Sequence, residues 1–230
     1  GASPHHLPIV PGWDVAGVVE AVGPAVTTGL RVGDEVWGYV RRDDVHAGTC
    51  AELVPAPQRT VALKPAGLSF EEAAAVPLAG LTGWQAVVGA LGVGAGDRLL
   101  VHAAAGGVGQ FAVQIALARG AEVVGTASAR NHDYLRGLGV TEVVDYIAGP
   151  VSEQLSAPVD AVLDLVGGDA LADAPRQVRD PARVASIVDA DTVLGLGGRY
   201  VFVSPDRGDL DELRSLADAG RLRVDIAEAF

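Results

Sequence analysis

The stretch that decides the fold is Leu99-Leu100-Val101-His102-Ala103-Ala104-Ala105-Gly106-Gly107-Val108-Gly109-Gln110-Phe111-Ala112-Val113-Gln114-Ile115-Ala116. An apolar run enters a glycine cluster that opens directly into a helical pattern, so the segment predicts a strand, a tight turn and a helix in series. The first turn of such a helix presents free backbone N–H groups and a positive dipole, which suit an anion. For a glycine turn between a strand and a helix, the expected anion is the pyrophosphate of a dinucleotide.

The glycine cluster departs in one place from the usual dinucleotide-binding pattern, G-x-G-x-x-G. The three matching positions are Ala104, Gly106 and Gly109, so an alanine replaces the first glycine. Gly106 would let the backbone approach a phosphate, and Gly109 would let the helix lie close to the sheet. The buried stripe expected on that helix is Val108, Ala112, Ile115 and Ala116. A glycine turn of a βαβ unit without a ligand is the alternative interpretation.

Composition indicates a globular protein and argues against two classes of partner. The 230 residues are 49% hydrophobic and 20% charged, and their net charge is −12. A nucleic-acid-binding protein would present a basic face, so nucleic acid is not an expected partner. No stretch of the sequence has the length and uninterrupted apolar character of a transmembrane helix, so a membrane is not expected either.

The cysteine count and the chain ends give two further expectations. Cys50 is the single cysteine, so no disulfide can form within the chain, and a reducing compartment, the cytoplasm, is predicted. Methionine is absent, and the chain begins at Gly1 and stops at Phe230 inside an apolar run. We therefore expect a fragment cut at both ends, with a processed or trimmed chain as the alternative.

Residues 1–75 are expected to form a small, partial β-barrel domain. Short runs rich in β-branched residues and separated by turns predict strands at 15–22, 35–40, 51–54 and 60–63. Ser69 and Glu72 have the spacing of a capping box, which predicts that a helix begins there.

Residues 76–220 alternate strand and helix patterns, which predicts an α/β fold with a doubly wound parallel sheet. Strands are expected at 98–103, 122–127, 142–146, 161–166, 183–188 and 199–204. Helices are expected at 107–119, 130–138, 169–179 and 209–219, the last with Asp209 and Glu212 as a cap pair. Segment 190–197 is short for a helical crossover. Residues 221–224 predict a strand, so 221–230 would start a return to the first domain.

The residues after the second parallel strand bear on the choice of nucleotide. An NAD site often has an Asp or Glu there to bind the ribose 2′-hydroxyl, but no acid appears before Asp133. Ser128 can donate a hydrogen bond, and the guanidinium of Arg130 suits a phosphate. NADPH is therefore predicted rather than NADH. A solvated arginine at a helix start is the alternative for Arg130.

Several motifs together resemble a known family. The quoted segments are Ala103–Gly109 as a phosphate loop, Pro11–Val19 as P-G-x-D-x-A-G-x-V, Gly33–Val36 as G-D-x-V, Pro77–Trp84, and Asp160–Gly168. They resemble the medium-chain dehydrogenase/reductase superfamily and, more narrowly, its zinc-independent quinone oxidoreductases related to zeta-crystallin. The resemblance covers essentially the whole chain. It implies a Rossmann domain joined to a GroES-like β-barrel domain, here partial, and a homodimer that pairs through the sheet edge near 199–204.

The resemblance also implies site residues. Cofactor contacts would fall on Thr82, Ala105, Gly106, Gly107, Val108, Gly109, Tyr146, Val166, Gly167, Ile187, Val188, Phe202 and Val203, beside Ser128 and Arg130. Trp13, Asp14 and Trp84 are candidates to line the substrate cleft. Some of these side chains have a structural alternative: Asp14 could cap backbone amides, and the apolar residues at strand ends could be core.

A metal is not predicted. Catalytic zinc needs about three protein ligands, but Trp13 stands where zinc-dependent relatives place a histidine, and Ala79 stands about where they place a cysteine. His5 and His6 are expected to be an exposed loop pair. Cys50 is expected to be a small, half-buried residue rather than a nucleophile. His102, in the first parallel strand, is expected to be a core histidine with its hydrogen bonds satisfied.

The predicted function is hydride transfer from NADPH to a small-molecule quinone or activated enone without zinc. Such acceptors take hydride readily because delocalisation stabilises the resulting anion, and the protein supplies orientation. No general acid is assigned. Reduction of simple alcohols or aldehydes is disfavoured because the zinc ligands are missing. A non-catalytic NADPH-binding structural or regulatory protein is the alternative.

Overall fold

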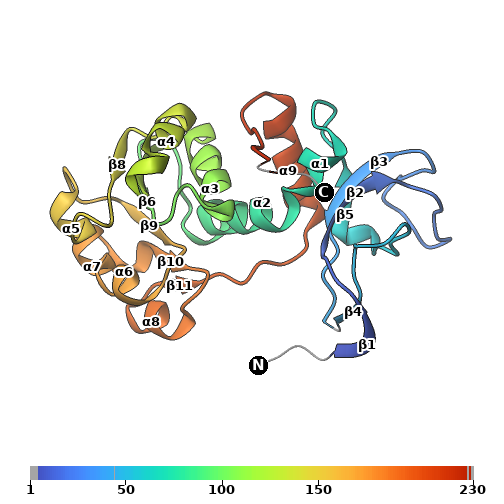
Figure 1. Ribbon diagram of the computed structural model, residues 1–230, viewed down its shortest axis with the longest axis horizontal. Coiled ribbons are helices and arrows are strands. Elements are labelled where there is room, and N and C mark those ends of the chain that lie inside the picture. Colours follow the sequence, from blue (N-terminus) through green and yellow to red (C-terminus); the bar gives the residue numbers. More distant parts are fainter. Residues whose placement is uncertain (1–4, 44, 227, 229–230) are drawn as a thin grey trace. The chain divides into compact units, whose positions relative to one another are not determined.

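A computed structural model describes residues 5–43, 45–226 and 228 (Figure 1). The chain forms two compact units. Unit 1 is Gly1–Leu81 with Ser204–Phe230, and unit 2 is Thr82–Val203.

This division differs from the predicted domains 1–75, 76–220 and 221–230. The predicted dinucleotide-binding domain included the helix at 209–219. Helix α9 (Arg207–Asp218) instead packs against β5 (Val61–Leu63) and belongs to unit 1. An added Cβ on Gly80 would lie 3.2 Å from Leu213 Cδ1, so α9 also lies against the end of unit 1 that leads into unit 2.

Unit 2 has a six-stranded parallel sheet at its centre, as the strand–helix alternation predicts. Its strands are β6 (Arg98–Val101), β7 (Glu122–Thr126), β8 (Glu142–Val144), β9 (Ala161–Asp164), β10 (Val184–Ser186) and β11 (Arg199–Tyr200). Their order is β11-β10-β9-β6-β7-β8. The first strand in sequence therefore lies between β7 and β9, so the order reverses beside β6. In doubly wound sheets, ligands bind at the carboxyl ends of the strands next to such a reversal.

Both faces of this sheet are covered by helices (Figure 1). On one face lie α3 (Gly107–Ala118) and α4 (His132–Leu138). On the other lie α5 (Val151–Gln154), α6 (Gly168–Ala172), α7 (Ala174–Gln177) and α8 (Ala190–Gly195). Side chains alternate along a strand, so a strand buried on both faces needs a continuous apolar run. The run 99–101 meets that requirement, because all three of its side chains are fully buried.

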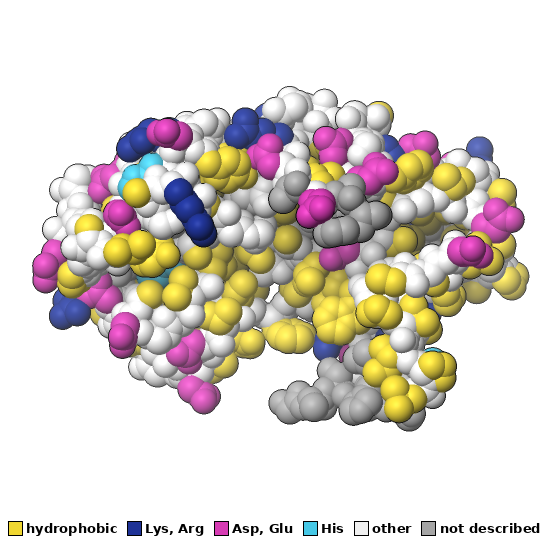
Figure 2. Space-filling model, viewed as in Figure 1, with side chains coloured by type: hydrophobic (Ala, Val, Ile, Leu, Met, Phe, Trp, Pro, Cys, Tyr) yellow, Lys and Arg dark blue, Asp and Glu magenta, His cyan; other side chains and the backbone are white. Residues whose placement is uncertain are grey.

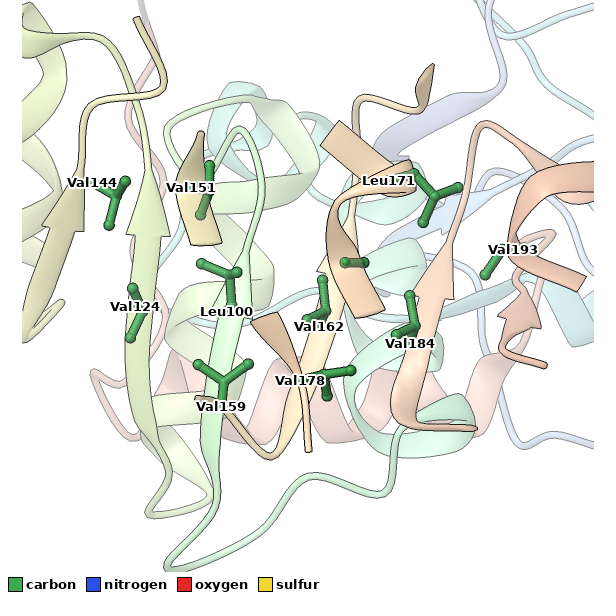
Figure 3. Close-up of a cluster of buried hydrophobic side chains, with 11 residues drawn as sticks. Leu100, Val124, Val144, Val151, Val159, Val162, Leu171, Val178, Val184 and Val193 are labelled. Atoms are coloured by element: carbon green, nitrogen blue, oxygen red, sulfur yellow. The ribbon is translucent and has the colours of Figure 1, made fainter. Parts of the chain in front are cut away.

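The second face has a core that joins five strands, β6 to β10, to the short helices. Figure 3 shows Leu100, Val124, Val162 and Val184 side by side, and the register pairs each with the next strand's residue. The helices contribute Val151, Leu171, Ala174 and Val193 to the same cluster.

Unit 1 contains a three-stranded antiparallel sheet and a separate parallel pair. The sheet order is β2 (Asp14–Val18), β3 (Glu35–Tyr39) and β5, and the pair is β1 (His5–Val10) with β4 (Val45–Ala47). Trp37 and Tyr39 of β3 are among its most buried side chains. Helix α1 (Phe70–Ala74) begins with the predicted capping box: Ser69 Oγ accepts from Glu72 N, and Glu72 Oε2 accepts from Ser69 N. Helix α2 (Pro77–Trp84) follows it.

Two predicted strands are wrong. Residues 51–54 and 221–224 contain no strand in the described part of the chain. Both segments carry β-branched or apolar residues, but a strand also needs a hydrogen-bonded neighbour, and no described strand lies beside either. The strand expected at 199–204 forms only at Arg199–Tyr200, where it pairs with β10.

Three helix predictions are also corrected. The helix expected at 169–179 is two short helices, α6 and α7, because Pro175 at the start of α7 cannot donate an intrahelical hydrogen bond. Segment 190–197 does hold a helix, α8, whose start Asp189 caps by accepting from Thr192 N at 3.0 Å. Helix α9 begins earlier than expected, because Asp206 is its cap and accepts from Asp209 N at 3.0 Å.

Charged and apolar side chains both lie on the face of the molecule that Figure 2 draws. Figure 2 shows acidic, basic and hydrophobic side chains interspersed over the visible face. Within the residues described, no helix is both long and apolar enough to cross a membrane.

Candidate dinucleotide-binding site

The turn after β6 is fixed by the end of β7. Ala103 N donates to Thr126 Oγ1, and Ala104 N donates to Thr126 O, both at 3.0 Å. Ala103 has a φ of 50°, a left-handed conformation that disfavours a side chain with a Cβ. These bonds hold the turn at the carboxyl edge of the sheet, where the order of strands reverses.

Helix α3 begins in this turn without a side-chain cap. Its N-cap is Gly106, whose backbone is extended (φ −79°, ψ 176°). Gln110 N donates to Gly106 O at 3.0 Å. The N–H groups of Gly107, Val108 and Gly109 precede that bond and have no acceptor within the helix.

Gly109 is closely packed, whereas Gly107 has open space beside it. A Cβ on buried Gly109 would lie 2.4 Å from Ala103 O, so no side chain fits between the helix and the turn. A Cβ on exposed Gly107 would meet nothing within 4 Å. Open space therefore adjoins uncapped amides at the positive end of a twelve-residue helix. This arrangement fits a diphosphate, as the sequence predicts.

The end of β7 carries the candidate adenosine-side residues. Ser128 is half-buried, and its carbonyl accepts from Asn131 N at 2.9 Å. Arg130 is exposed in the short 3₁₀ helix Ala129–Asn131, and its guanidinium has no ion-pair partner among the described residues. Asp133, the nearest acid, pairs with Arg136 at 2.9 Å. The only cation in this turn is therefore available to an outside anion.

The loops after β9 and β10 touch each other. Gly167 has a φ of 77°, and a Cβ there would lie 3.3 Å from Val188 Cγ2. Val166 and Val188 are exposed at 55% and 51%, and Ile187 is partly buried. These residues therefore form one surface at the carboxyl edge of the sheet.

The remaining predicted cofactor residues also lie in unit 2. Tyr146, just beyond β8, and Phe202, beyond β11, are exposed, whereas Val203 is half-buried. Ala105 is half-buried in the turn. Thr82 is buried near the end of α2. Its neighbour Gly83 packs on α3, since a Cβ there would lie 3.1 Å from Ala112 N.

Sequence reasoning missed the most connected polar group of this edge, Asp164. The carboxylate is fully buried and accepts from His102 Nδ1 at 3.1 Å, Ser186 Oγ at 2.7 Å and Gly167 N at 3.0 Å. Burial pushes the pKa of Asp164 up, but these hydrogen bonds outweigh it, and the pKa lies below its ordinary value. His102 is the satisfied core histidine that was predicted. The sequence did offer a signal for Asp164, because it is an acidic residue at the end of an apolar strand.

Trp13 and Asp14 lie together in unit 1. They line a cavity of about 300 Å³ whose other walls include Val10, Val40 and Leu78. Asp14 Oδ1 accepts from Leu78 N at 2.7 Å, so the backbone-capping alternative is confirmed. Burial raises the pKa of Asp14 to about 6, against the lowering effect of that hydrogen bond.

Trp13 is held within unit 1 by its neighbours. Its ring lies edge-on to Tyr39, with ring centroids 6.4 Å apart, and the guanidinium of Arg41 lies 5.8 Å from its centroid. Trp84, the third cleft candidate, is half-buried in unit 2. It is not among the residues that line this cavity.

Across the described ranges, no group of three His, Cys, Asp or Glu side chains could hold a metal ion. Cys50 is exposed, not half-buried as predicted. The backbone of His5 and His6 lies in β1 rather than in a loop.

Comparison with known proteins places the chain in a family. The family model described as zinc-binding dehydrogenase matches residues 107–189. The chain is 31% identical to NAD(P)H oxidoreductase RTN4IP1, mitochondrial, of Danio rerio over 98% of this chain and 66% of that protein. It is 35% identical to 2-methylene-furan-3-one reductase of Solanum lycopersicum over 96% of this chain and 57% of that protein. The chain thus spans less than two thirds of the length of these relatives.

Solved structures agree. The quinone oxidoreductase from Coxiella burnetii superposes with a TM-score of 0.87 at 34% identity, covering 96% of this chain and 71% of that one. The Escherichia coli quinone oxidoreductase complexed with NADPH superposes with a TM-score of 0.79 at 28% identity, covering 96% and 74%. With this fold, the uncapped glycine turn and these relatives, the chain belongs to the medium-chain dehydrogenase/reductase superfamily.

Proposed function

We propose that the protein is an oxidoreductase that uses NADPH to reduce a small quinone or an activated enone. The observation that carries the proposal is the uncapped start of α3, where Gly107 faces open space at the carboxyl edge of the sheet. The relatives support it by their names: one is a quinone oxidoreductase complexed with NADPH, and one is a 2-methylene-furan-3-one reductase.

Each part of the carboxyl edge has a proposed role toward the cofactor. The amides of Gly107 and Val108 hold the pyrophosphate. Ser128 and Arg130 hold the 2′-phosphate of the adenosine ribose, because an unpaired guanidinium binds phosphate in a bidentate manner. The remaining predicted contacts, Thr82, Ala105, Gly106, Gly109, Tyr146, Val166, Gly167, Ile187, Val188, Phe202 and Val203, line the rest of the cofactor.

The residues of this chain act by binding and orientation. The reduced nicotinamide, when bound, supplies the hydride. Quinones and enones suit this chemistry because delocalisation stabilises the anion formed. Trp13, Asp14 and Trp84 are the proposed cleft residues, and the donor set of the described residues gives no role to zinc. We also propose a cytoplasmic homodimer without nucleic-acid or membrane partners.

Nucleotide preference tests the role of Arg130. The wild type is expected to bind NADPH at least about tenfold more tightly than NADH, and Arg130→Ala is expected to remove most of that difference. Binding is followed by fluorescence titration, with Arg136→Ala as a matched control on the neighbouring helix. Equal or tighter binding of NADH by the wild type would refute the NADPH assignment.

Turnover tests the reaction. Oxidation of NADPH is followed by the loss of its absorbance, with 1,4-benzoquinone, a 2-alkenal and a simple aldehyde as acceptors. We expect turnover with the first two acceptors and none with the simple aldehyde. The turnover should occur in a preparation that contains less than one zinc ion per protein chain. Tight NADPH binding without turnover of any acceptor would favour a non-catalytic nucleotide-binding protein.

A further inference from the structure

A row of buried, hydrogen-bonded polar side chains lies at the carboxyl edge of the sheet in unit 2. His102 follows β6, Asp164 is the last residue of β9 and Ser186 is the last residue of β10, while Gln177 comes from α7. His102 is 1% exposed and the other three are 0% exposed. Buried polar groups are costly unless each is hydrogen-bonded, so such a row indicates a specific constraint.

One ring nitrogen of His102 faces an amide oxygen. Gln177 Nε2 donates to Asp173 Oδ2 at 2.9 Å, which leaves Gln177 Oε1 facing His102 Nε2 at 3.0 Å. Asp173 cannot be the donor. Burial pushes its pKa up, but bonds from Gln177, Arg176 and Ser152 keep it below the ordinary value. An amide oxygen only accepts, so His102 Nε2 must donate.

The other ring nitrogen of His102 faces a second acceptor. Nδ1 lies 3.1 Å from Asp164 Oδ1, and an ionised carboxylate also only accepts. His102 therefore bridges Gln177 and Asp164 in the interior of the sheet.

Asp164 and Ser186 also accept hydrogen bonds from backbone amides of the loops after β9 and β10. Asp164 accepts from Val166 N at 3.2 Å and from Gly167 N at 3.0 Å. Ser186 Oγ donates to Asp164 Oδ2 and accepts from the amides of Val188 and Asp189, both at 3.2 Å. The two loops at the carboxyl edge thus share one anchor.

This cluster is not a hydrolytic triad. The serine hydroxyl bonds to the aspartate rather than to the histidine, and its two lone pairs are taken by backbone amides. Ser186 is also fully buried, so it cannot reach a substrate. What the cluster does is shape the two loops.

We propose that Asp164, bonded to His102 and Ser186, is a positioning residue that fixes loops 165–167 and 187–189 in the shape that receives the nicotinamide half of the cofactor. The inference rests on the proposed function. The loops follow β9 and β10, whereas the pyrophosphate turn follows β6 and the adenosine-side residues follow β7. Loss of the anchor should therefore weaken one half of the dinucleotide site and spare the other.

Two ligands distinguish the adenosine half of the dinucleotide site from the nicotinamide half. Adenosine 2′,5′-bisphosphate has no nicotinamide, so it reports only on the adenosine side, and NADPH reports on both. Asp164→Asn places an amide N–H₂ against groups that donate, and Ser186→Ala removes the acceptor for two loop amides. We expect each variant to raise the Kd of NADPH about tenfold and to change the Kd of the bisphosphate less than about twofold.

Asp97→Asn is the matched stability control. Asp97 forms a two-point ion pair with Arg183, at 2.8 and 3.1 Å, at the amino ends of the same strands. It should lower the unfolding midpoint without changing the Kd of either ligand. If Asp164→Asn weakened both ligands equally, or neither, the positioning role would be wrong. If the wild type bound the bisphosphate but not NADPH, the proposed function would fail as well.

A measurement on the wild type avoids dependence on folded variants. Amide hydrogen exchange should show Val166, Gly167, Val188 and Asp189 protected, although they lie in loops. Free exchange at these amides would overturn the anchor.

Discussion

At the scale of single residues, buried charges determine local structure that no sequence pattern reveals. Lys64, the only lysine of the chain, is 5% exposed at its side chain. Its ammonium lies 3.2 Å from Glu35 Oε2 and donates to Pro65 O at 3.0 Å. Asp14 accepts from an amide 64 residues away in the chain. Such pairings depend on the folded topology, which explains why the sequence alone left the role of Asp14 open.

The raised pKa of Asp14 predicts a pH-dependent stability. Its folded pKa of about 6 exceeds the value of 3.8 expected in the unfolded chain, so the folded state binds the proton more tightly. The contribution to stability is complete below about pH 4 and is lost as the pH rises through 6. Asp14→Asn keeps the acceptor for Leu78 N and removes the buried charge. We expect it to raise the free energy of unfolding by about 2–3 kcal/mol at pH 7–8 and hardly at all at pH 4.

Urea unfolding of both proteins at a series of pH values checks this. Asp169→Asn, which changes an exposed aspartate, serves as the control and should leave the profile of the wild type unchanged. A difference between wild type and Asp14→Asn that stays constant from pH 4 to 8 would show that the side chain is not titrating as described.

At the scale of elements, the sequence predicted most strands and helices of unit 2 because their signals are local. The apolar run 99–101 and the glycine turn are signals of this kind. The stripe expected on α3 is buried at Ala112, Ile115 and Ala116, but Val108 is only partly buried, and the helix also buries Phe111 and Val113. One error occurs where a distant partner decides, because residues 51–54 lack a neighbouring strand. The division of the helix expected at 169–179 has a local cause, Pro175, which the helical composition of the segment outweighed in the prediction.

Packing of α3 on the turn depends on Gly109. Gly109→Ala would put a methyl group 2.4 Å from Ala103 O and 2.7 Å from Ala104 O, both rigid backbone atoms. We expect a loss of about 2–4 kcal/mol in the free energy of unfolding, measured by urea denaturation. Gly195→Ala, at an exposed helical position with open space around the Cβ, is the control and should cost nothing. Comparable stability of the two variants would contradict the close approach of helix and turn.

At the scale of the whole molecule, the sequence located the candidate site but not what shapes it. Parallel topology brings 106–109, 128–130, 166–167 and 187–188 to one edge of unit 2, as the motifs predicted. The hydrogen-bonded side chains of His102, Asp164 and Ser186 are up to 84 positions apart in the sequence, so hydrophobic periodicity cannot reveal their contact. The domain boundary also differed, because α9 packs on unit 1.

The central claim is that the open start of α3 receives the cofactor's diphosphate, and one substitution tests it directly. Gly107 is the first residue of α3, and a Cβ there would meet no atom within 4 Å. The helix dipole stabilises an acidic side chain at this position. Gly107→Asp should therefore leave the protein at least as stable, while its charge repels a phosphate. Gly107→Asn has nearly the same shape without the charge and is the matched control.

The measurement is the Kd of NADPH by fluorescence titration for the wild type and both variants, with thermal unfolding measured in parallel. We predict that Gly107→Asp weakens binding at least about a hundredfold, that Gly107→Asn weakens it much less, and that neither lowers the unfolding temperature. NADPH binding of Gly107→Asp with the affinity of the wild type would contradict the account.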